Sequence, residues 1–174
     1  MDLRYPIGQF AHTGEVTQAH RKQWIQDIAE LPTQAREAVQ GLSEEQLRLP
    51  YREGGWMLQQ VIHHMADSHM NSVIRFKLAL TEDTPEIRPY YEERWAELSD
   101  SRALDIEVSL QLLDALHHRW TALLHTLSDG DYARRFYHPA SKETMRLDHC
   151  LGLYAWHGQH HTAQIMSLRN RLGI

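Results

Sequence analysis

The sequence predicts an all-α protein that folds as a four-helix bundle. Four long stretches of the 174-residue chain carry apolar residues at helical spacing, and no segment shows the alternation typical of a half-buried strand. Each stretch has about 20 residues and one apolar face. Four such faces are buried best against one another, which favours a bundle. The length is typical of one domain, so we expect residues 1–174 to form a single domain.

The first long helix is predicted from about Val16 to Val39. Trp24, Ile28 and Leu31 lie on one face of it, which we expect to be buried. Pro32 follows Leu31 within the same predicted helix. Because proline lacks an amide hydrogen and its ring clashes with the preceding turn, we expect Pro32 to kink this helix or to divide it in two.

A short helix and a second long helix are predicted next. In GLSEEQL, Ser43 and Gln46 have the spacing of a capping box, which predicts the start of a short helix. The second long helix is predicted from about Trp56 to Leu80. Its apolar stripe consists of Leu58, Val61, Ile62, Met65, Phe76 and Leu80, and Ile74 and Leu78 indicate further burial at its far end.

The third and fourth long helices are predicted at about 106–127 and 147–172. Two long links, residues 81–105 and 128–146, precede them, and neither has a sustained apolar face. Connections of this length are either functional or crossovers. From these residues alone, both an up-and-down order and a crossover topology stay open.

Composition and charge exclude several classes of protein. The chain has 18 basic and 23 acidic residues, a formal net charge of -5 and no run of Lys or Arg, so we expect no nucleic-acid partner and no membrane. Cys150 is the only cysteine, which excludes an internal disulfide and agrees with a reducing compartment. The N-terminal residues lack the apolar stretch of a signal peptide. We therefore expect a soluble, cytoplasmic protein.

The fourth helix contains the segment WHGQHH, residues 156–161. At 100° per residue, His157 and His161 fall on its apolar face one turn apart, a spacing that lets two imidazoles reach one metal ion. His160 is expected to point toward solvent. Gly158 lies on the buried side, where the missing side chain lets a helix or a ligand come close, at a cost of about 1 kcal/mol in helix propensity.

The pair His157 and His161 also has a purely structural interpretation. Two histidines on an apolar face can be core residues, each hydrogen-bonded to a carbonyl or a carboxylate. Burying unpaired imidazoles costs roughly 1 to 3 kcal/mol each, and a shared cation would remove that cost. The HxxxH pair is a weak signal by itself, and a metal site needs a third ligand.

The second helix offers His63, His64 and His69 as that ligand. His69 lies in the middle of the apolar stripe, His63 lies on the opposite, solvent side, and His64 lies at the border, on a polar line with Ser68, Asn71 and Arg75. Spacing favours His64 over His69 only slightly. On the third helix His117 lies near the apolar edge and is a reserve candidate. These alternatives remain open on periodicity alone.

Several segments closely resemble the YfiT branch of the DinB-like metalloprotein superfamily. They are PYREGGW, HHMADSHMNSVIRFKLALTEDTPEIRPY, HHRWTALL, FYHP and LGLYAWHGQHH, and the similarity extends from Tyr5 to the C-terminus. The resemblance implies a four-helix bundle with long crossover connections and one divalent metal per subunit. It also implies the ligands: His64 matches the histidine of the second helix, and His157 and His161 match the HxxxH pair of the fourth. A homodimer is expected from the resemblance only.

The resemblance and the ligand set together imply a metal-dependent enzyme. Three imidazoles leave a coordination position open for water or substrate, and they suit zinc or nickel best, with iron, cobalt and manganese as alternatives. The metal would activate water, which predicts a hydrolase of a small molecule. It could instead activate a thiol, because related proteins transfer low-molecular-weight thiols such as bacillithiol. A third alternative is a metal-binding or small-ligand-binding protein without turnover.

Substrate contacts are less well defined by the sequence. Asn71 and Arg75, with Tyr137 and His138 of the second link, are the candidates for the pocket wall, and Arg75 would suit a carboxylate. Cys150 is expected to be a small buried hydrophobe rather than a nucleophile. No residue stands out as a general base.

Overall fold

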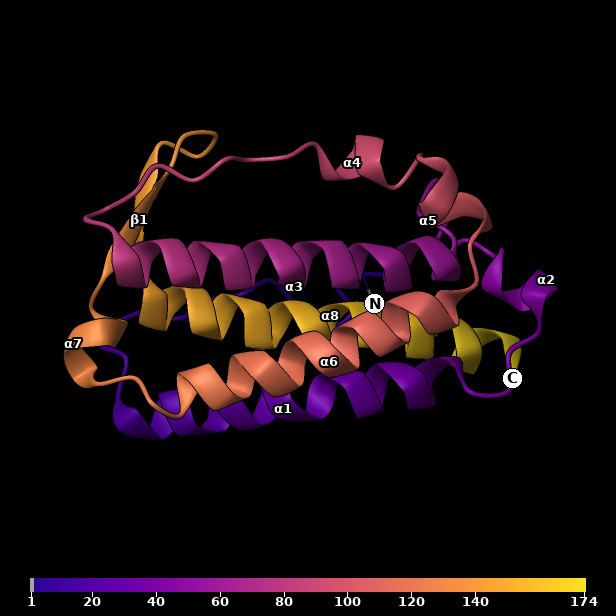
Figure 1. Cartoon of the computed structure of the whole chain (residues 1–174). Helices are drawn as coiled ribbons and strands as arrows, with labels where there is room; N and C mark the ends of the chain where they lie inside the picture. The colour runs from indigo at the N-terminus through magenta and orange to yellow at the C-terminus, as the bar shows by residue number, and fades with distance from the viewer. Residues whose placement is uncertain (1) are drawn as a thin grey trace.

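A bundle of four long helices forms the body of the protein in the computed structural model, which describes residues 2–174 (Figure 1). The helices are α1 (Gln18–Val39), α3 (Leu58–Thr81), α6 (Ile106–Leu124) and α8 (Leu147–Leu172). The predicted all-α class and four-helix bundle are confirmed. Helix α8 begins and ends at the predicted residues, whereas α6 ends at Leu124 rather than at Leu127.

Helices α1 and α3 lie diagonally across the bundle, because each of them packs against both α6 and α8. Contacts along the helices give their directions. His69 of α3 lies beside His117 of α6, and His63 lies beside Ser109, so α3 and α6 run parallel. Helices α3 and α8 run antiparallel, as Figure 1 shows. A parallel neighbour can be reached only by a chain that returns along the whole bundle, which is the crossover that the resemblance implied.

The crossover between α3 and α6 runs the length of the bundle over α3 and includes the short helices α4 (Glu92–Trp95) and α5 (Ser99–Ala103) (Figure 1). It is tied to the bundle near both ends. The Ile87 amide donates to the Tyr137 carbonyl at 3.0 Å, and the Gln60 side chain donates to the Ala96 carbonyl at 2.7 Å. The crossover therefore forms a wall beside the first turns of α3.

A small hairpin precedes α8 and was not predicted. After the single turn α7 (Asp129–Tyr132), the strands β1 (Arg135–His138) and β2 (Glu143–Arg146) pair antiparallel, with Phe136 opposite Met145. Each strand has four residues, which is too short for a clear alternating pattern to be seen in the sequence. The expectation that the chain has no strand was therefore wrong here.

Two of the local sequence signals, the capping box and the proline, had different outcomes. Ser43 and Gln46 form the predicted capping box at the start of α2 (Glu44–Leu47). Pro32, however, does not divide the first helix, because α1 continues through it to Val39. The residues around Pro32 are buried, Leu31 at 2% exposure and Ala35 at 0%. Packing of this face offsets the roughly 3 kcal/mol that an interior proline costs.

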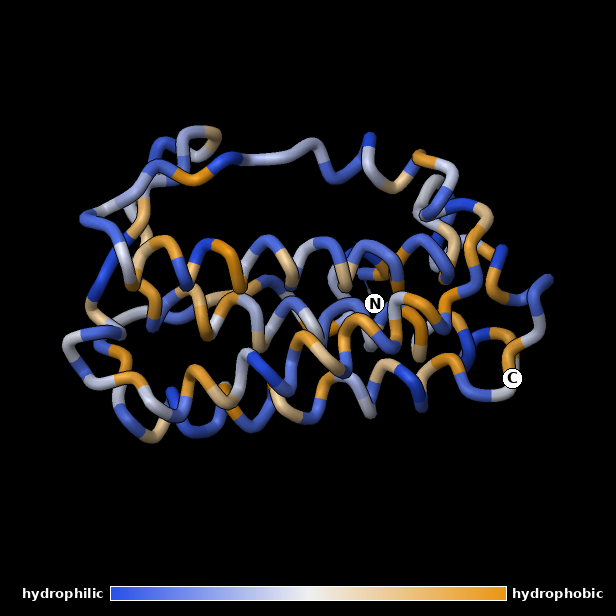
Figure 2. The backbone as a smooth tube through the Cα atoms, in the orientation of Figure 1, coloured by the Kyte–Doolittle hydropathy of each residue, from blue (hydrophilic) through white to orange (hydrophobic). Residues whose placement is uncertain are grey.

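Two clusters of buried apolar side chains fill most of the interior of the bundle. Figure 2 shows hydrophobic residues, in orange, on all four long helices. The largest fully buried side chains are Trp120, Phe76, Phe136, Ile28, Leu31, Leu58, Ile62, Met65, Ile87, Leu113, Leu124 and Leu147. Ile74 is 49% exposed, so the burial expected for it was wrong. Among residues 2–174, no helix is both long and apolar enough to cross a membrane.

Helices α1 and α8 approach closely at two glycines. A Cβ atom on Gly158 would lie 2.7 Å from Cδ1 of Leu31, and one on Gly152 would lie 2.8 Å from the Trp24 ring. Both distances are far below van der Waals contact. Gly158 therefore makes room for a neighbouring helix, which confirms one of the two explanations for a glycine at this position.

Replacing Gly158 by alanine should destabilise the protein although alanine favours helix formation. Overpacking against Leu31 costs about 1 to 3 kcal/mol, and the gain in helix propensity is about 1 kcal/mol, so we expect the free energy of unfolding to fall by up to about 2 kcal/mol. Urea unfolding measures this. Gln159→Ala on the same turn is the control and should change little. A Gly158→Ala protein more stable than the parent would contradict the close approach.

Candidate metal centre

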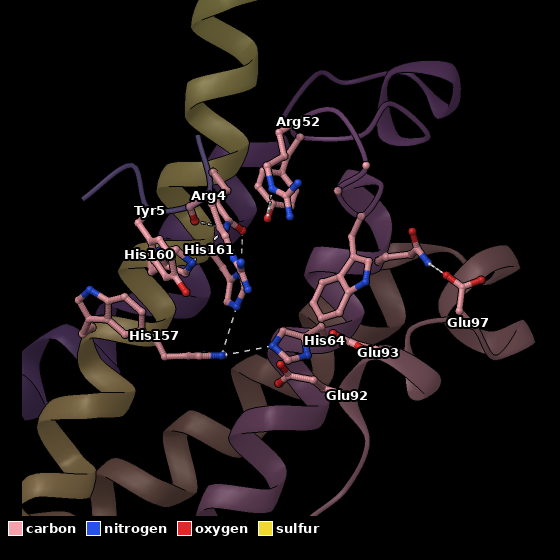
Figure 3. Close-up of a pocket in the computed structure, with 17 residues that line it drawn as sticks. Arg4, Tyr5, Arg52, His64, Glu92, Glu93, Glu97, His157, His160 and His161 are labelled. Carbon is pink, nitrogen blue, oxygen red and sulfur yellow. Dashed lines mark hydrogen bonds between the residues drawn. The ribbon is translucent and has the colours of Figure 1, made fainter. Parts of the chain in front are cut away.

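Three histidines from two antiparallel helices converge near one end of α3 (Figure 3). His64 comes from α3, and His157 and His161 come from α8. Nε2 of His157 lies 3.3 Å from Nε2 of His64 and 3.2 Å from Nε2 of His161. Within residues 2–174, these are the only three metal-ligating side chains that come together in this way. The structure thus brings together the three residues that the resemblance implied.

Local packing explains this convergence. His157 and His161 are four residues apart on α8, so their rings are neighbours and meet edge to face, with centroids 4.5 Å apart. His64 faces them from α3 because the two helices are antiparallel and adjacent at this level. The Trp56 ring packs on the outer side of His64 with its centroid 4.8 Å away. The three rings are therefore held by packing from both helices.

A buried glutamine fixes the orientation of His161. The Gln164 amide nitrogen donates to the Arg4 carbonyl at 2.9 Å, and a carbonyl can only accept, so this end of the amide is the NH₂ group. The other end, Oε1, lies 2.9 Å from Nδ1 of His161, which must donate to it. The neutral His161 ring therefore carries its proton on Nδ1. Its Nε2 lone pair faces the centre of the cluster.

Burial keeps these imidazoles neutral at pH 7. Desolvation lowers the pKa of His64 to about 4, with a smaller contribution from His160. Burial, followed by repulsion between the neighbouring imidazoles, lowers the pKa of His157 and of His161 well below the usual value. A neutral ring offers one nitrogen lone pair, and metal binding needs that lone pair. The cluster is therefore in the protonation state of a ligand set.

Two further histidines form a line that leads from His157 into the interior of the bundle. His69 is fully buried, as its place in the apolar stripe predicted, and its Nε2 lies 3.1 Å from Nδ1 of His157. His117, the reserve candidate, is 1% exposed, and its Nε2 lies 2.9 Å from Nδ1 of His69. Neither residue belongs to the converging group. Both lie behind it instead.

His63 and His160 differ from their predicted placement. His63 was expected on the solvent side, yet it is 5% exposed and lies 2.7 Å from Ser109 Oγ, because α6 and the end of the crossover cover it. His160 was also expected in solvent and is 5% exposed. The N-terminal residues cover it, and its ring stacks on Trp156 at 4.6 Å. The periodicity of one helix cannot show which distant segments cover its outer face.

A pocket of about 610 Å³ opens onto the three histidines (Figure 3). It is lined by the N-terminal segment, by the loop before α3 and by the crossover. Arg4 and Arg52 lie on one side, and the carboxylates of Glu92 and Glu93 lie on the other. The pocket is therefore polar and carries both signs of charge.

The predicted pocket residues do not line this cavity. Asn71 donates to the Asp67 carbonyl at 2.8 Å, and Arg75 donates to the Tyr154 hydroxyl at 3.2 Å. They lie further along α3, at least one turn beyond the cluster. The N-terminal segment and Glu92 were missed because nothing in the sequence indicates where the crossover passes.

Cys150 is fully buried, as expected for a small hydrophobe. Its Sγ lies 3.9 Å from Ser72 Oγ, and burial raises the pKa of the thiol to about 12. A thiol in this state is not a nucleophile at neutral pH.

Comparisons with known proteins agree with this fold. The family model of the DinB superfamily matches residues 27–165. A Bacillus mycoides (strain KBAB4) protein whose name begins "Putative metal-dependent hydrolase" is 56% identical over 171 residues, 98% of each chain. "Putative metal-dependent hydrolase YfiT" of Bacillus subtilis (strain 168) is 51% identical over 173 residues, 99% of this chain and 97% of that one.

A solved structure is also similar over almost the whole length. It is described as "YfiT from Bacillus subtilis is a probable metal-dependent hydrolase with an unusual four-helix bundle topology", and it matches with a TM-score of 0.97 and 51% identity over 99% of each chain. With more than half of this chain matched by the family model, and with relatives of this identity over nearly full length, the chain belongs to the DinB superfamily.

Proposed function

We propose that this protein is a metal-dependent hydrolase of a small molecule and that His64, His157 and His161 hold its divalent ion. The convergence of three Nε2 atoms carries the proposal, because their spacings of 3.2 and 3.3 Å suit a shared ion. Nε2 of His161 carries no proton, since Nδ1 donates to Gln164. A cation would satisfy lone pairs that otherwise face one another. Three imidazoles suit zinc or nickel.

The surroundings of the cluster favour catalysis over a structural role. Structural zinc sites are closed by four protein ligands, whereas catalytic sites keep a position open. Here three ligands are available, and the fourth side faces a pocket of about 610 Å³. A divalent ion bound there would lower the pKa of a coordinated water toward neutrality. The pocket is large enough for a small-molecule substrate.

We assign the role of proton acceptor to Glu92. Its carboxylate lines the pocket opposite the arginines, and desolvation, together with the neighbouring charge of Glu93, raises its pKa. A carboxylate on the pocket wall can accept a proton from a group bound in the pocket. Glu97, by contrast, is engaged by Arg102 and by the Gln60 amide. Arg4 and Arg52 would bind an anionic group of the substrate and orient it.

Metal analysis of purified variants tests the ligand set. We expect His64→Ala and His157→Ala to lose the ion, because two imidazoles bind it far more weakly than three. His63→Ala is the matched control, a buried neighbour on the same helix that lies outside the cluster, and it should keep its metal. Full metal content in both ligand variants would rule out the assignment. Loss of metal with an unchanged melting temperature would argue against a structural ion.

Activity measurements test the reaction class. The metal-loaded protein should hydrolyse members of a panel of small esters and amides, and Glu92→Gln should lower kcat about 100-fold or more at unchanged metal content. Glu97→Gln is the control and should have little effect. A parallel assay supplies bacillithiol with an electrophilic acceptor. Thiol conjugation without any hydrolysis would overturn the hydrolase proposal.

The metal-free protein should lose stability in mild acid. Because the pKa of His64 is about 4 when folded and about 6.5 when unfolded, the unfolded chain binds more protons between these values. The contribution of the neutral His64 to the free energy of unfolding is therefore fully present above about pH 6.5 and decreases as the pH is lowered toward 4. With several such imidazoles, urea unfolding from pH 7.5 to 5 should give a slope above about 1.4 kcal/mol per pH unit, the value for one proton. A pH-independent free energy of unfolding would contradict this.

A further inference from the structure

A line of three buried imidazoles connects the cluster to the backbone of α1. From the protein interior outward, Nδ1 of His117 lies 2.6 Å from the Ile28 carbonyl oxygen, Nε2 of His117 lies 2.9 Å from Nδ1 of His69, and Nε2 of His69 lies 3.1 Å from Nδ1 of His157. All three contacts have hydrogen-bond length. The line joins α1, α6, α3 and α8 in turn, so every long helix of the bundle takes part.

The carbonyl at the inner end determines the direction of every hydrogen bond in the line. The Ile28 oxygen can only accept, so Nδ1 of His117 carries a proton and donates. A neutral His117 then has a lone pair on Nε2, and Nδ1 of His69 must donate to it. A neutral His69 in turn accepts at Nε2, so Nδ1 of His157 must donate. The proton of His157 is therefore on Nδ1.

We propose that His69 and His117 are positioning residues, which hold His157 in the tautomer whose Nε2 lone pair faces the metal position. This inference rests on the proposed function for its purpose, but the tautomer is a property of the metal-free protein. His69 and His117 would thus support the proposed ligand His157 without contacting the ion themselves. A ligand imidazole commonly donates its other N–H to an acceptor that fixes its tautomer, and here the acceptor is another imidazole.

If the hydrogen bond between His69 and His157 ran in the opposite direction, one of the buried imidazoles would have to be a cation. For His157 to accept at Nδ1, His69 would have to donate from Nε2. It could do so by donating from both nitrogens, which makes it a cation at 0% exposure, or by accepting at Nδ1, in which case His117 would have to donate from both nitrogens. That His117 would be positively charged at 1% exposure, and within residues 2–174 no carboxylate forms a hydrogen bond with it. Burying an unpaired charge is strongly unfavourable. In that state Nε2 of His157 would carry a proton and could not bind a metal.

The tautomer of His161 is fixed in a similar way to that of His157. There the Gln164 oxygen, itself oriented by the Arg4 carbonyl, accepts from Nδ1. In both cases a backbone carbonyl, which cannot change its role, fixes the proton on Nδ1 through one or more intermediate side chains. Two of the three ligands are thus presented with Nε2 free before any ion arrives.

Histidine ¹⁵N NMR of the metal-free wild-type protein at pH 7.5 tests the tautomers directly. We expect His117, His69 and His157 each to be neutral with the proton on Nδ1. A proton on Nε2 of His157 would overturn the proposal. This result does not depend on activity or on metal binding, so failure of the proposed function would not obscure it.

Metal affinity of matched variants tests the consequence. His117→Leu removes the acceptor of His69, so we expect His157 to populate the Nε2–H tautomer and zinc affinity to fall about 10- to 100-fold. His117→Gln can still accept through its amide oxygen and should recover most of that loss. His63→Leu controls for loss of a buried, hydrogen-bonded histidine outside the line. Equal zinc affinities in His117→Leu and His63→Leu would overturn the proposal, and so would an unchanged His157 tautomer in His117→Leu.

Discussion

The Nε2 atoms of His64 and His161 both lie within 3.3 Å of Nε2 of His157 in a helical bundle, and much of the structure follows from that constraint. Helices α3 and α8 must be antiparallel and adjacent at one level, which the crossover topology provides. Gly158, next to His157, lets α1 pack closely on α8. One turn away on α1, the Ile28 carbonyl accepts the innermost hydrogen bond of the histidine line. Helix α1, which contributes none of the three converging histidines, thus supports the cluster through this hydrogen bond.

Burial has opposite effects on stability and on function at this site. Excluding water from the histidines lowers the pKa of His64 to about 4 and keeps the whole cluster neutral, which leaves lone pairs available. The same desolvation leaves polar nitrogens facing one another, an arrangement that costs stability unless something fills the centre. A bound cation removes that cost. The outer side of the cluster stays open to a pocket with arginines on one wall and glutamates on the other.

The bundle and the ligand helix could be predicted because their signals are local. Helical spacing alone placed α8 at its observed bounds and paired His157 with His161. Spacing favoured His64 over His69 only slightly, and both are buried and contact His157. The resemblance made that choice, and the structure groups His64, not His69, with His157 and His161. The burial of His160 and the place of Glu92 on the pocket wall depend on the N-terminal segment and the crossover. Tertiary contacts determine the paths of these segments, and the spacing of apolar residues in the sequence does not reveal such contacts.

The central claim is that His64, His157 and His161 bind one divalent ion through their Nε2 atoms. X-ray absorption spectroscopy of the zinc-loaded protein measures this most directly, because it reports the number and type of ligand atoms and their distances. We expect three imidazole nitrogens at about 2.0 to 2.1 Å, with the remaining coordination filled by oxygen ligands. A zinc shell that contains fewer than three imidazoles, or a sulfur at about 2.3 Å, would contradict the account.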